Sequence, residues 1–154
     1  MQANRHYEQK NEVLAENASG EGQVMPLLGL AFWRMKHAFE SDVGLSAATW
    51  FLLSMLIDED GISQGEVSDR FEVDPSRITR LAQKLEKDGL LLRKRDPKDN
   101  RVVRLHATEE GRRQIESRQG LREGFEERIR RELSQEELAE FRRVLGVVAR
   151  LMKD

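Results

Sequence analysis

One stretch constrains the fold of this chain more than any other: a well-capped helix that leads directly into a basic hairpin. The helix is predicted to begin at Asp74, because aspartate is a good N-cap and Pro75 suits the first helical position. Gly89 is predicted to end the helix as the glycine that follows the C-cap. Three leucines, a basic triplet, the turn-forming sequence DPKDN and a second strand, RVVRLH, come next. A helix followed at once by a two-stranded hairpin is the plan of a winged helix-turn-helix.

The predicted helix is amphipathic. At 100° per residue its apolar side chains fall on one side, and they are Ile78, Leu81, Ala82 and Leu85. Polar side chains fall on the other side or at its margin, and they are Ser76, Arg77, Thr79, Arg80, Gln83, Lys84 and Lys87. The apolar side is expected to pack on the domain, which leaves the polar side for solvent or a partner.

The basic charge of the protein is concentrated in this stretch. From Asp74 to His106 there are ten Lys and Arg against five Asp and Glu, a local charge of +5, whereas the whole chain carries −2 and the remainder therefore −7. A basic patch in an otherwise acidic protein is the footprint of a binder of the phosphate backbone. A solvated helix face would also be rich in Lys and Arg, but the basic hairpin behind the helix favours nucleic-acid binding.

Length and composition predict one soluble, helix-rich domain, or one such domain with a tail, in the cytoplasm. The 154 residues are enough to bury a core, and 35% of them are charged. Cysteine is absent and the three histidines are far apart, so neither a metal site nor a disulfide is expected. No glycine-rich phosphate loop or catalytic constellation is present, so we expect no enzyme activity, catalytic residue or cofactor. The chain also lacks an apolar run of the ~20 residues that a membrane crossing needs, and a signal-peptide core.

The chain is predicted to have four parts. Residues 1–23 form a mobile N-terminal arm, and residues 24–44 a helix for dimerisation and ligand binding. Residues 45–109 form the winged helix-turn-helix, and residues 110–154 the C-terminal dimerisation helices. The first helix, predicted from Gln23 to Ser41, is apolar on more than one side and therefore needs more than one packing partner.

Two further helices precede the polar-faced one. Ser46 is predicted to cap a helix from Ala47 to about Asp58, and its almost entirely apolar sequence makes this helix central to the fold. Ser63 and Glu66 form a capping box for a short helix that ends near Phe71. Two capped helices about three residues apart, the second with a polar outer face, are typical of a helix-turn-helix.

After the hairpin, Thr108 is predicted to cap a helix that runs to about Leu133. Gly120 and Gly124 lie inside it, and they indicate either a bend or a close approach of another backbone. The sequence leaves these two alternatives open.

The last predicted helix begins with a second capping box, Ser134 and Glu137. Its apolar residues recur three and four apart, and they are Leu138, Phe141, Val144, Leu145, Val148, Leu151 and Met152. Such a stripe needs a partner, and we expect another subunit to supply it. The predicted fold is therefore mainly α with a small wing hairpin: a winged helix-turn-helix with N- and C-terminal dimerisation helices.

The hairpin also carries a family resemblance. Asp99-Asn-Arg101, followed by VVRLHAT and Gly111, resembles the D-x-R…L-T-x-x-G signature of the MarR family of transcriptional regulators. The segment RITRLAQKLEKDGLLLRKRDPKDNRVVRL is similar to the recognition helix and wing of that family, and LSAATWFLL and QGEVSDRF lie where the family places its second and third helices. The resemblance covers roughly residues 24–152. It departs from the family at Ala107, where leucine is usual, and in the length of the N-terminal arm.

The resemblance implies a triangular homodimer on a palindromic double-stranded DNA operator, with the recognition helix in the major groove and the wing tip in the minor groove. By matching position, Arg101 would enter the minor groove, and Asp99 would pair with Arg95 or Arg101. The predicted base readers are Ser76, Arg77, Thr79, Arg80 and Gln83. The predicted phosphate contacts are Lys84, Arg93, Arg95, Lys98 and the N-terminus of the helix capped by Ser63.

The resemblance also implies an effector, because family members often bind small aromatic acids or phenolic compounds and then loosen their grip on DNA. The predicted ligand-binding residues are Trp33, Arg34, His37 and Trp50, which offer aromatic walls and a cation for a carboxylate. The two tryptophans could instead be core or dimer-interface residues, and the histidine a structural one.

Other functions remain open beside a ligand-responsive repressor. One is a DNA-binding regulator or activator without a small-molecule effector. Another is a winged helix used only for protein contacts, but that use would not require the basic wing.

Overall fold

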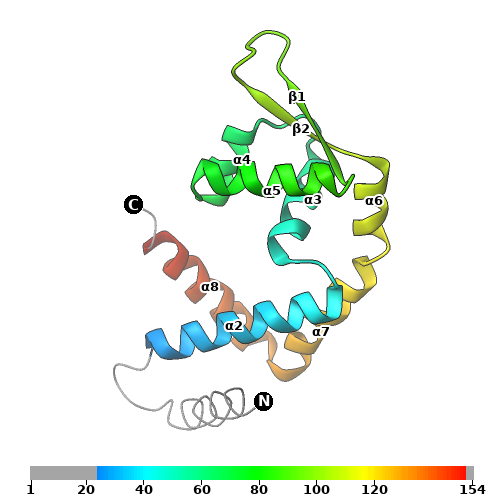
Figure 1. Cartoon of the computed structure of the whole chain (residues 1–154). Helices are drawn as coiled ribbons and strands as arrows, with labels where there is room; N and C mark the ends of the chain where they lie inside the picture. Colours follow the sequence, from blue (N-terminus) through cyan, green and yellow to red (C-terminus); the bar gives the residue numbers. More distant parts are fainter. Residues whose placement is uncertain (1–23, 152–154) are drawn as a thin grey trace, which may run out of the picture. The chain divides into compact units, whose positions relative to one another are not determined.

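The structure, a computed structural model, describes residues 24–151, and the predicted arm at residues 1–23 lies outside this range. The chain divides into two compact units, Met1–Ala47 and Ala48–Asp154. The described helices and strands are α2 (Val24–Val43), α3 (Ala47–Asp58), α4 (Gln64–Phe71), α5 (Pro75–Lys87), β1 (Leu91–Arg95), β2 (Val103–Ala107), α6 (Glu109–Glu116), α7 (Gln119–Glu132) and α8 (Gln135–Leu151) (Figure 1). None of these described helices combines the length and the apolar character that a membrane crossing requires.

Helix α2 is the described helix of the first unit. It confirms the helix predicted from Gln23 to Ser41 and continues to Val43. Several large apolar side chains of α2 are exposed in the single chain, and they are Val24, Met25, Leu28, Phe32, Trp33 and Met35. An apolar surface of this extent indicates a missing packing partner.

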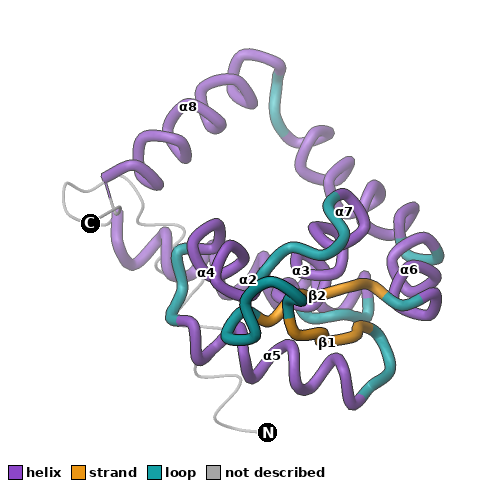
Figure 2. Tube along the Cα trace, turned by 90° about the horizontal axis from the view of Figure 1, so that it is seen from above, coloured by secondary structure: helices purple, strands orange, loops and turns teal. Residues whose placement is uncertain are grey.

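The core of the second unit is built around α3, as its apolar sequence predicts. Leu52, Leu53 and Leu56 are fully buried. Helix α4 packs against α5 and β2, α5 packs against β1, and α6 packs against β2. Figure 2 shows the two strands beside α5. This arrangement of three helices and a hairpin is the predicted winged helix-turn-helix.

Both predicted capping boxes are present. The Ser63 hydroxyl accepts from Glu66 N at 3.1 Å, and the Glu66 carboxylate accepts from Ser63 N at 2.8 Å. The Ser134 hydroxyl accepts from Glu137 N at 3.2 Å, and the Glu137 carboxylate accepts from Ser134 N at 2.8 Å. These bonds satisfy backbone N–H groups that have no partner inside the helix, and they fix where α4 and α8 begin.

The boundaries of α5 also follow from its own residues. The Asp74 carboxylate accepts from Ser76 N at 2.8 Å, and Pro75 occupies the first turn, where its missing N–H is not needed. Gly89 has a φ of +74°, a left-handed conformation that glycine adopts without strain. The chain can therefore leave α5 and enter β1 within three residues.

The hairpin is antiparallel, with Leu91 opposite Ala107 and Arg95 opposite Val103. The loop before α4 adds a short third pairing to it. Gly61 N donates to Leu105 O, and Leu105 N donates to Ile62 O, both at 2.9 Å. The base of the wing is therefore hydrogen-bonded both within the hairpin and to the start of the helix-turn-helix.

The prediction of one long helix that Thr108 caps and that runs to about Leu133 is wrong, because the structure has two helices there, α6 and α7. In a continuous helix Arg118 N would donate to Gln114 O, but here it donates to Ile115 O at 3.1 Å. The Gln114 carbonyl instead accepts from Ser117 Oγ at 3.3 Å and from Arg118 Nη1 at 3.1 Å. These two side chains replace the backbone donor and end the helix.

The glycines do not mark the division between α6 and α7. It falls at Ser117 and Arg118, before Gly120 and Gly124. A Cβ on either glycine would meet nothing within 4 Å, apart from the helix's own backbone. Within the described chain, no second backbone approaches them closely.

Candidate nucleic-acid interface

Helix α5 presents the predicted polar face to solvent. Ile78, Ala82 and Leu85 are buried, which confirms the predicted apolar side. Of the predicted base readers and phosphate contacts on α5, all are exposed except the half-buried Thr79; the exposed ones are Ser76, Arg77, Arg80, Gln83 and Lys84. With the exposed Lys87, the face therefore carries four cations and several neutral hydrogen-bonding groups.

Two of these side chains are joined on the surface of α5. Arg80 Nη2 donates to Ser76 Oγ at 3.2 Å, and Arg80 Nε donates to Ser76 O at 3.3 Å. The guanidinium is thus held against the first turn of the helix, next to a hydroxyl that can also donate. A guanidinium can read guanine and a hydroxyl can serve several bases, so this pair is chemically suited to contact base edges.

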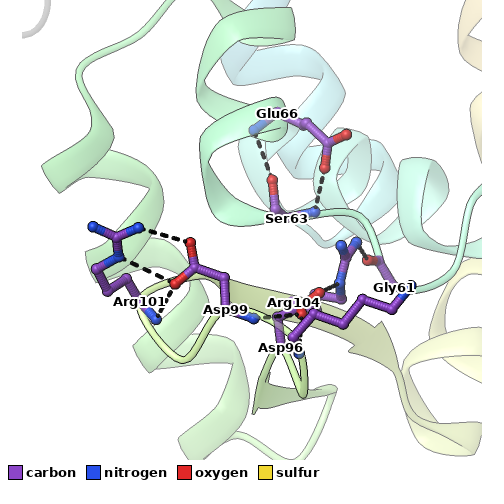
Figure 3. A network of polar contacts seen from close by, with 8 residues as sticks. Gly61, Ser63, Glu66, Asp96, Asp99, Arg101 and Arg104 are labelled. Carbon is purple, nitrogen blue, oxygen red and sulfur yellow. Dashed lines mark hydrogen bonds and ion pairs between the residues drawn. The ribbon is translucent and has the colours of Figure 1, made fainter.

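The wing tip carries a highly exposed predicted DNA-binding group, Arg101. The Arg101 side chain is 91% exposed. Asp99 Oδ1 accepts from Arg101 N at 3.0 Å and from its Nε at 3.1 Å, and Asp99 Oδ2 accepts from its Nη2 at 3.2 Å (Figure 3). Arg95 bonds elsewhere, to Asn100 O at 2.7 Å. Of the two partners considered for Asp99, the structure selects Arg101.

The Asp99 carboxylate is suited to hold this arginine at neutral pH. Its hydrogen bonds with the Arg101 side chain and backbone keep the pKa of Asp99 below its usual value. The ionised form is therefore favoured, and with it the charged pair. The Arg101 guanidinium keeps N–H groups beyond those bound to Asp99, because it has five in all.

Asp96 organises the wing tip and was missed in the sequence analysis. Its Oδ1 accepts from Lys98 N at 2.7 Å and from Asp99 N at 3.0 Å, and its Oδ2 pairs with Arg104 Nε. The pairing with Arg104 and these backbone bonds lower the pKa of Asp96. An aspartate that starts a turn commonly bonds the backbone two residues on, so the sequence Asp96-Pro was an available signal.

Arg93 differs from the other predicted phosphate contacts. Its side chain is only 22% exposed, and its Nη1 lies 3.4 Å from Glu86 Oε2. Arg93 N also donates to Glu86 Oε1 at 3.1 Å. The pair ties β1 to α5. Arg95 and Lys98, by contrast, are exposed.

The N-terminus of α4 bears the remaining predicted contact, Ser63. Its hydroxyl oxygen is used as the cap acceptor for Glu66 N. The Ser63 side chain and backbone both hydrogen-bond with the Glu66 carboxylate and lower its pKa. A phosphate at this end of α4 would therefore have to be bound by the remaining backbone N–H groups of the first turn. The Glu66 carboxylate in this turn reduces the attraction for an anion.

The four predicted ligand-binding residues lie in two units. Trp33, Arg34 and His37 are exposed on α2, where the Trp33 ring stands edge-on to Phe32 with a centroid distance of 5.7 Å. Trp50 on α3 is 4% exposed and so contributes to the core of the second unit. It also lines a cavity of about 640 Å³ together with eight other residues, among them Ile57, Ile115 and Arg122.

Within residues 24–151, no group of three or more His, Asp and Glu side chains is placed to hold a metal ion.

The known proteins compared below, which resemble this chain, are transcriptional regulators. Residues 45–103 match the model of the MarR family. The HTH-type transcriptional regulator YdgJ of Bacillus subtilis is 32% identical over 142 residues, which cover 92% of this chain and 85% of YdgJ. The HTH-type transcriptional repressor MdtR of the same organism is 37% identical over 68 residues, 44% of each protein. The crystal structure of the PcaV transcriptional regulator from Streptomyces coelicolor with its natural ligand superposes with a TM-score of 0.77 at 25% identity, over 88% of this chain and 96% of PcaV.

Proposed function

This chain belongs to the MarR family of DNA-binding transcriptional regulators, and from that premise we propose that it is a homodimeric repressor of a palindromic operator, released by a small aromatic or phenolic ligand. The observation that carries the proposal is the combination of a polar, cationic face on α5 with the 91% exposed Arg101 at the wing tip. The relative MdtR is named as a repressor, which supports the direction of control.

In the proposed complex, α5 enters the major groove. Ser76, Arg77, Thr79, Arg80 and Gln83 read base edges, because hydroxyl, guanidinium and amide groups match the donor and acceptor pattern there. The groups that contact phosphate and fix the register are Lys84, Arg93, Arg95, Lys98 and the N-terminus of α4, which Ser63 caps.

The wing supplies the second contact. Arg101 enters the adjacent minor groove, where a narrow groove concentrates the negative potential of both strands. Asp99 holds the Arg101 side chain through its two oxygens, so the arginine is partly ordered before it meets DNA. Part of the entropy of ordering a long side chain is thereby lost on folding rather than on binding.

The proposed dimer rests on the apolar surfaces that the single chain leaves exposed. On α8, Phe141, Val144 and Leu145 are each more than 40% exposed. Helix α2 of the first unit separately exposes a set of large apolar side chains, and each helix thus leaves more apolar surface uncovered than scattered single residues would. A two-fold dimer would bury such surfaces and would match the symmetry of a palindrome.

Operator binding can be tested by fluorescence anisotropy with a labelled duplex taken upstream of the protein's own gene. We expect tight binding that falls steeply with salt, and much weaker binding to a scrambled duplex of equal composition. Arg101→Ala should weaken operator binding about tenfold or more and make the salt slope shallower by roughly two, one for each subunit. Equal, weak binding to both duplexes would contradict the proposed function.

The proposed effector site comprises Trp33, Arg34, His37 and Trp50. The crystal structure of PcaV with its natural ligand supports a small-molecule site in this chain as well. Titration of aromatic acids and phenols should quench tryptophan fluorescence and release labelled operator. Arg34→Ala should weaken the response to the acids about tenfold, whereas Arg34→Lys, which keeps the charge, should weaken it less.

Three outcomes separate the alternatives. Identical titration curves for wild type and Arg34→Ala would exclude the role of this arginine. Operator binding that no ligand of these classes relieves would favour an effector-independent regulator. Ligand-strengthened operator binding would contradict release.

A further inference from the structure

We propose that Asp96 is a positioning residue for DNA binding, which fixes the direction in which the wing tip presents Arg101. The inference rests on the proposed function, because it assumes that Arg101 contacts DNA. It assigns a role to a buried carboxylate: the Asp96 side chain is 9% exposed, whereas the Asp99 side chain is 43% exposed.

On the side of the tip, Asp96 holds the turn that carries Arg101. Its Oδ1 accepts from Lys98 N and Asp99 N, at 2.7 and 3.0 Å. Its backbone N donates to Val102 O at 2.9 Å, and Val102 N donates to Asp99 O at 2.9 Å. Residues 96–102 are thus closed into one hydrogen-bonded loop. Asp99, which is fixed by this loop, binds the Arg101 side chain.

On the side of the domain, the same carboxylate is linked to the helix-turn-helix. Asp96 Oδ2 pairs with Arg104 Nε, and Arg104 Nη1 donates to Gly61 O at 2.9 Å. Gly61 N in turn donates to Leu105 O at 2.9 Å, next to Arg104 on β2. Figure 3 shows this path from Arg101 and Asp99 through Asp96 and Arg104 to Gly61, with the capping pair of α4 nearby.

The link matters because a two-stranded hairpin is flexible by itself. Isolated hairpins are marginally stable, so the far end of a wing needs additional contacts to keep one direction. The Asp96–Arg104 pair provides them at the point where the strands end and the loop begins. Without the pair, Arg101 would be ordered only when it meets the minor groove, and the operator affinity would fall accordingly.

If Asp96 only stabilised the hairpin, its loss would not act on DNA binding through Arg101. Asp60 provides a control for such a stabilising role. Asp60 also pairs with a basic residue of β2, because His106 Nδ1 lies 2.9 Å from Asp60 Oδ2. Arg112 Nη2 lies 3.8 Å from the other oxygen of Asp60. This pair anchors the other end of β2, and in the described part of the chain neither the Asp60 nor the His106 side chain forms a hydrogen bond or ion pair with residues 96–102. Loss of the Asp60 pair should therefore weaken the anchoring of β2 without misdirecting Arg101.

The test is a double-mutant cycle on operator affinity, measured by anisotropy at a temperature where thermal unfolding shows every variant to be folded. Asp96→Ala should weaken binding about fivefold to tenfold, and Asp96→Asn, which can still accept from the two backbone N–H groups, should weaken it less. The double variant Asp96→Ala/Arg101→Ala should bind within about twofold of Arg101→Ala, because the first change acts through the second residue. Asp60→Asn should leave the effect of Arg101→Ala unchanged.

The outcomes distinguish this inference from the proposed function. If wild type does not prefer the operator, or Arg101→Ala binds like wild type, the proposed function of the wing fails and the inference fails with it. If Arg101→Ala weakens binding but the Asp96→Ala and Arg101→Ala effects multiply, the proposed function stands and the positioning role is overturned. Wild-type affinity of Asp96→Ala would overturn it as well.

Discussion

Replacement of Gly111 with alanine is expected to lower the free energy of unfolding by about 3 kcal/mol or more, and the melting temperature by roughly 10 °C. A Cβ on Gly111 would lie 2.1 Å from Leu90 O, a distance that real Cβ atoms do not adopt. The carbonyl cannot easily retreat, because Thr108 N donates to it at 3.1 Å. Nor can Gly111 move away, since its own N–H donates to Thr108 Oγ1 at 3.0 Å. The measurement is thermal and denaturant unfolding at a fixed protein concentration.

Gly124→Ala is the matched control for this prediction. It makes the same chemical change inside α7, where a Cβ would meet nothing within 4 Å apart from the helix's own backbone. Alanine has the higher helix propensity, so this variant should gain up to about 1 kcal/mol. If the two variants melted alike, α6 would be free to shift away from Leu90, and the proposed steric reason would be wrong.

The second large effect is expected at the proposed dimer interface. Leu145 on α8 is 42% exposed in the single chain, and a glutamate in its place would put a charge into the surface that we propose the partner covers. The buried charge should prevent dimerisation, so Leu145→Glu should be a monomer. A dimer that binds two half-sites together has an affinity roughly 10²–10⁴ times that of one subunit on one half-site, so the monomer should bind the operator at least 100-fold more weakly. Analytical ultracentrifugation and anisotropy measure the two consequences separately.

Ala139→Glu serves as the control for Leu145→Glu. It adds the same charge to the same exposed helix, but on the opposite side from the apolar stripe. We expect it to remain a dimer and to lose little affinity for DNA. A dimeric Leu145→Glu protein would show that the subunits associate through another surface.

Most boundaries of the elements were predicted from the sequence because their causes are local. The capping boxes at Ser63 and Ser134 join residues three apart. The end of α5 depends on the left-handed conformation of Gly89 and on the bond from Leu90 N to Leu85 O, five residues earlier. The division between α6 and α7 is also local, yet it was missed. It depends on which donor reaches the Gln114 carbonyl, and neither Ser117 nor Arg118 has a strong helix-ending propensity.

The sequence also predicted the chemistry of the candidate interface but not its internal pairing. Composition and periodicity placed the polar residues of α5 on one exposed face, as the structure has them. The family resemblance left Arg95 and Arg101 as alternative partners of Asp99, and the prediction grouped Arg93 with the phosphate contacts although Arg93 is tied to Glu86. The spacing of charges in a hairpin limits which groups are near each other, but the twist and register of the strands decide which of them meet.

The sequence by itself therefore determined the class of fold, the ends of most helices and the basic character of the wing, because each depends on residues within a few positions of one another. The tertiary structure alone decided that Asp96 is buried and that Arg104 joins it to Gly61, 43 residues earlier in the chain. The Asp96 carboxylate is stable in its buried position because two backbone N–H groups and Arg104 are bonded to it. Only the folded domain brings Gly61 to Arg104, so the link from the wing to the helix-turn-helix is a property of the tertiary structure.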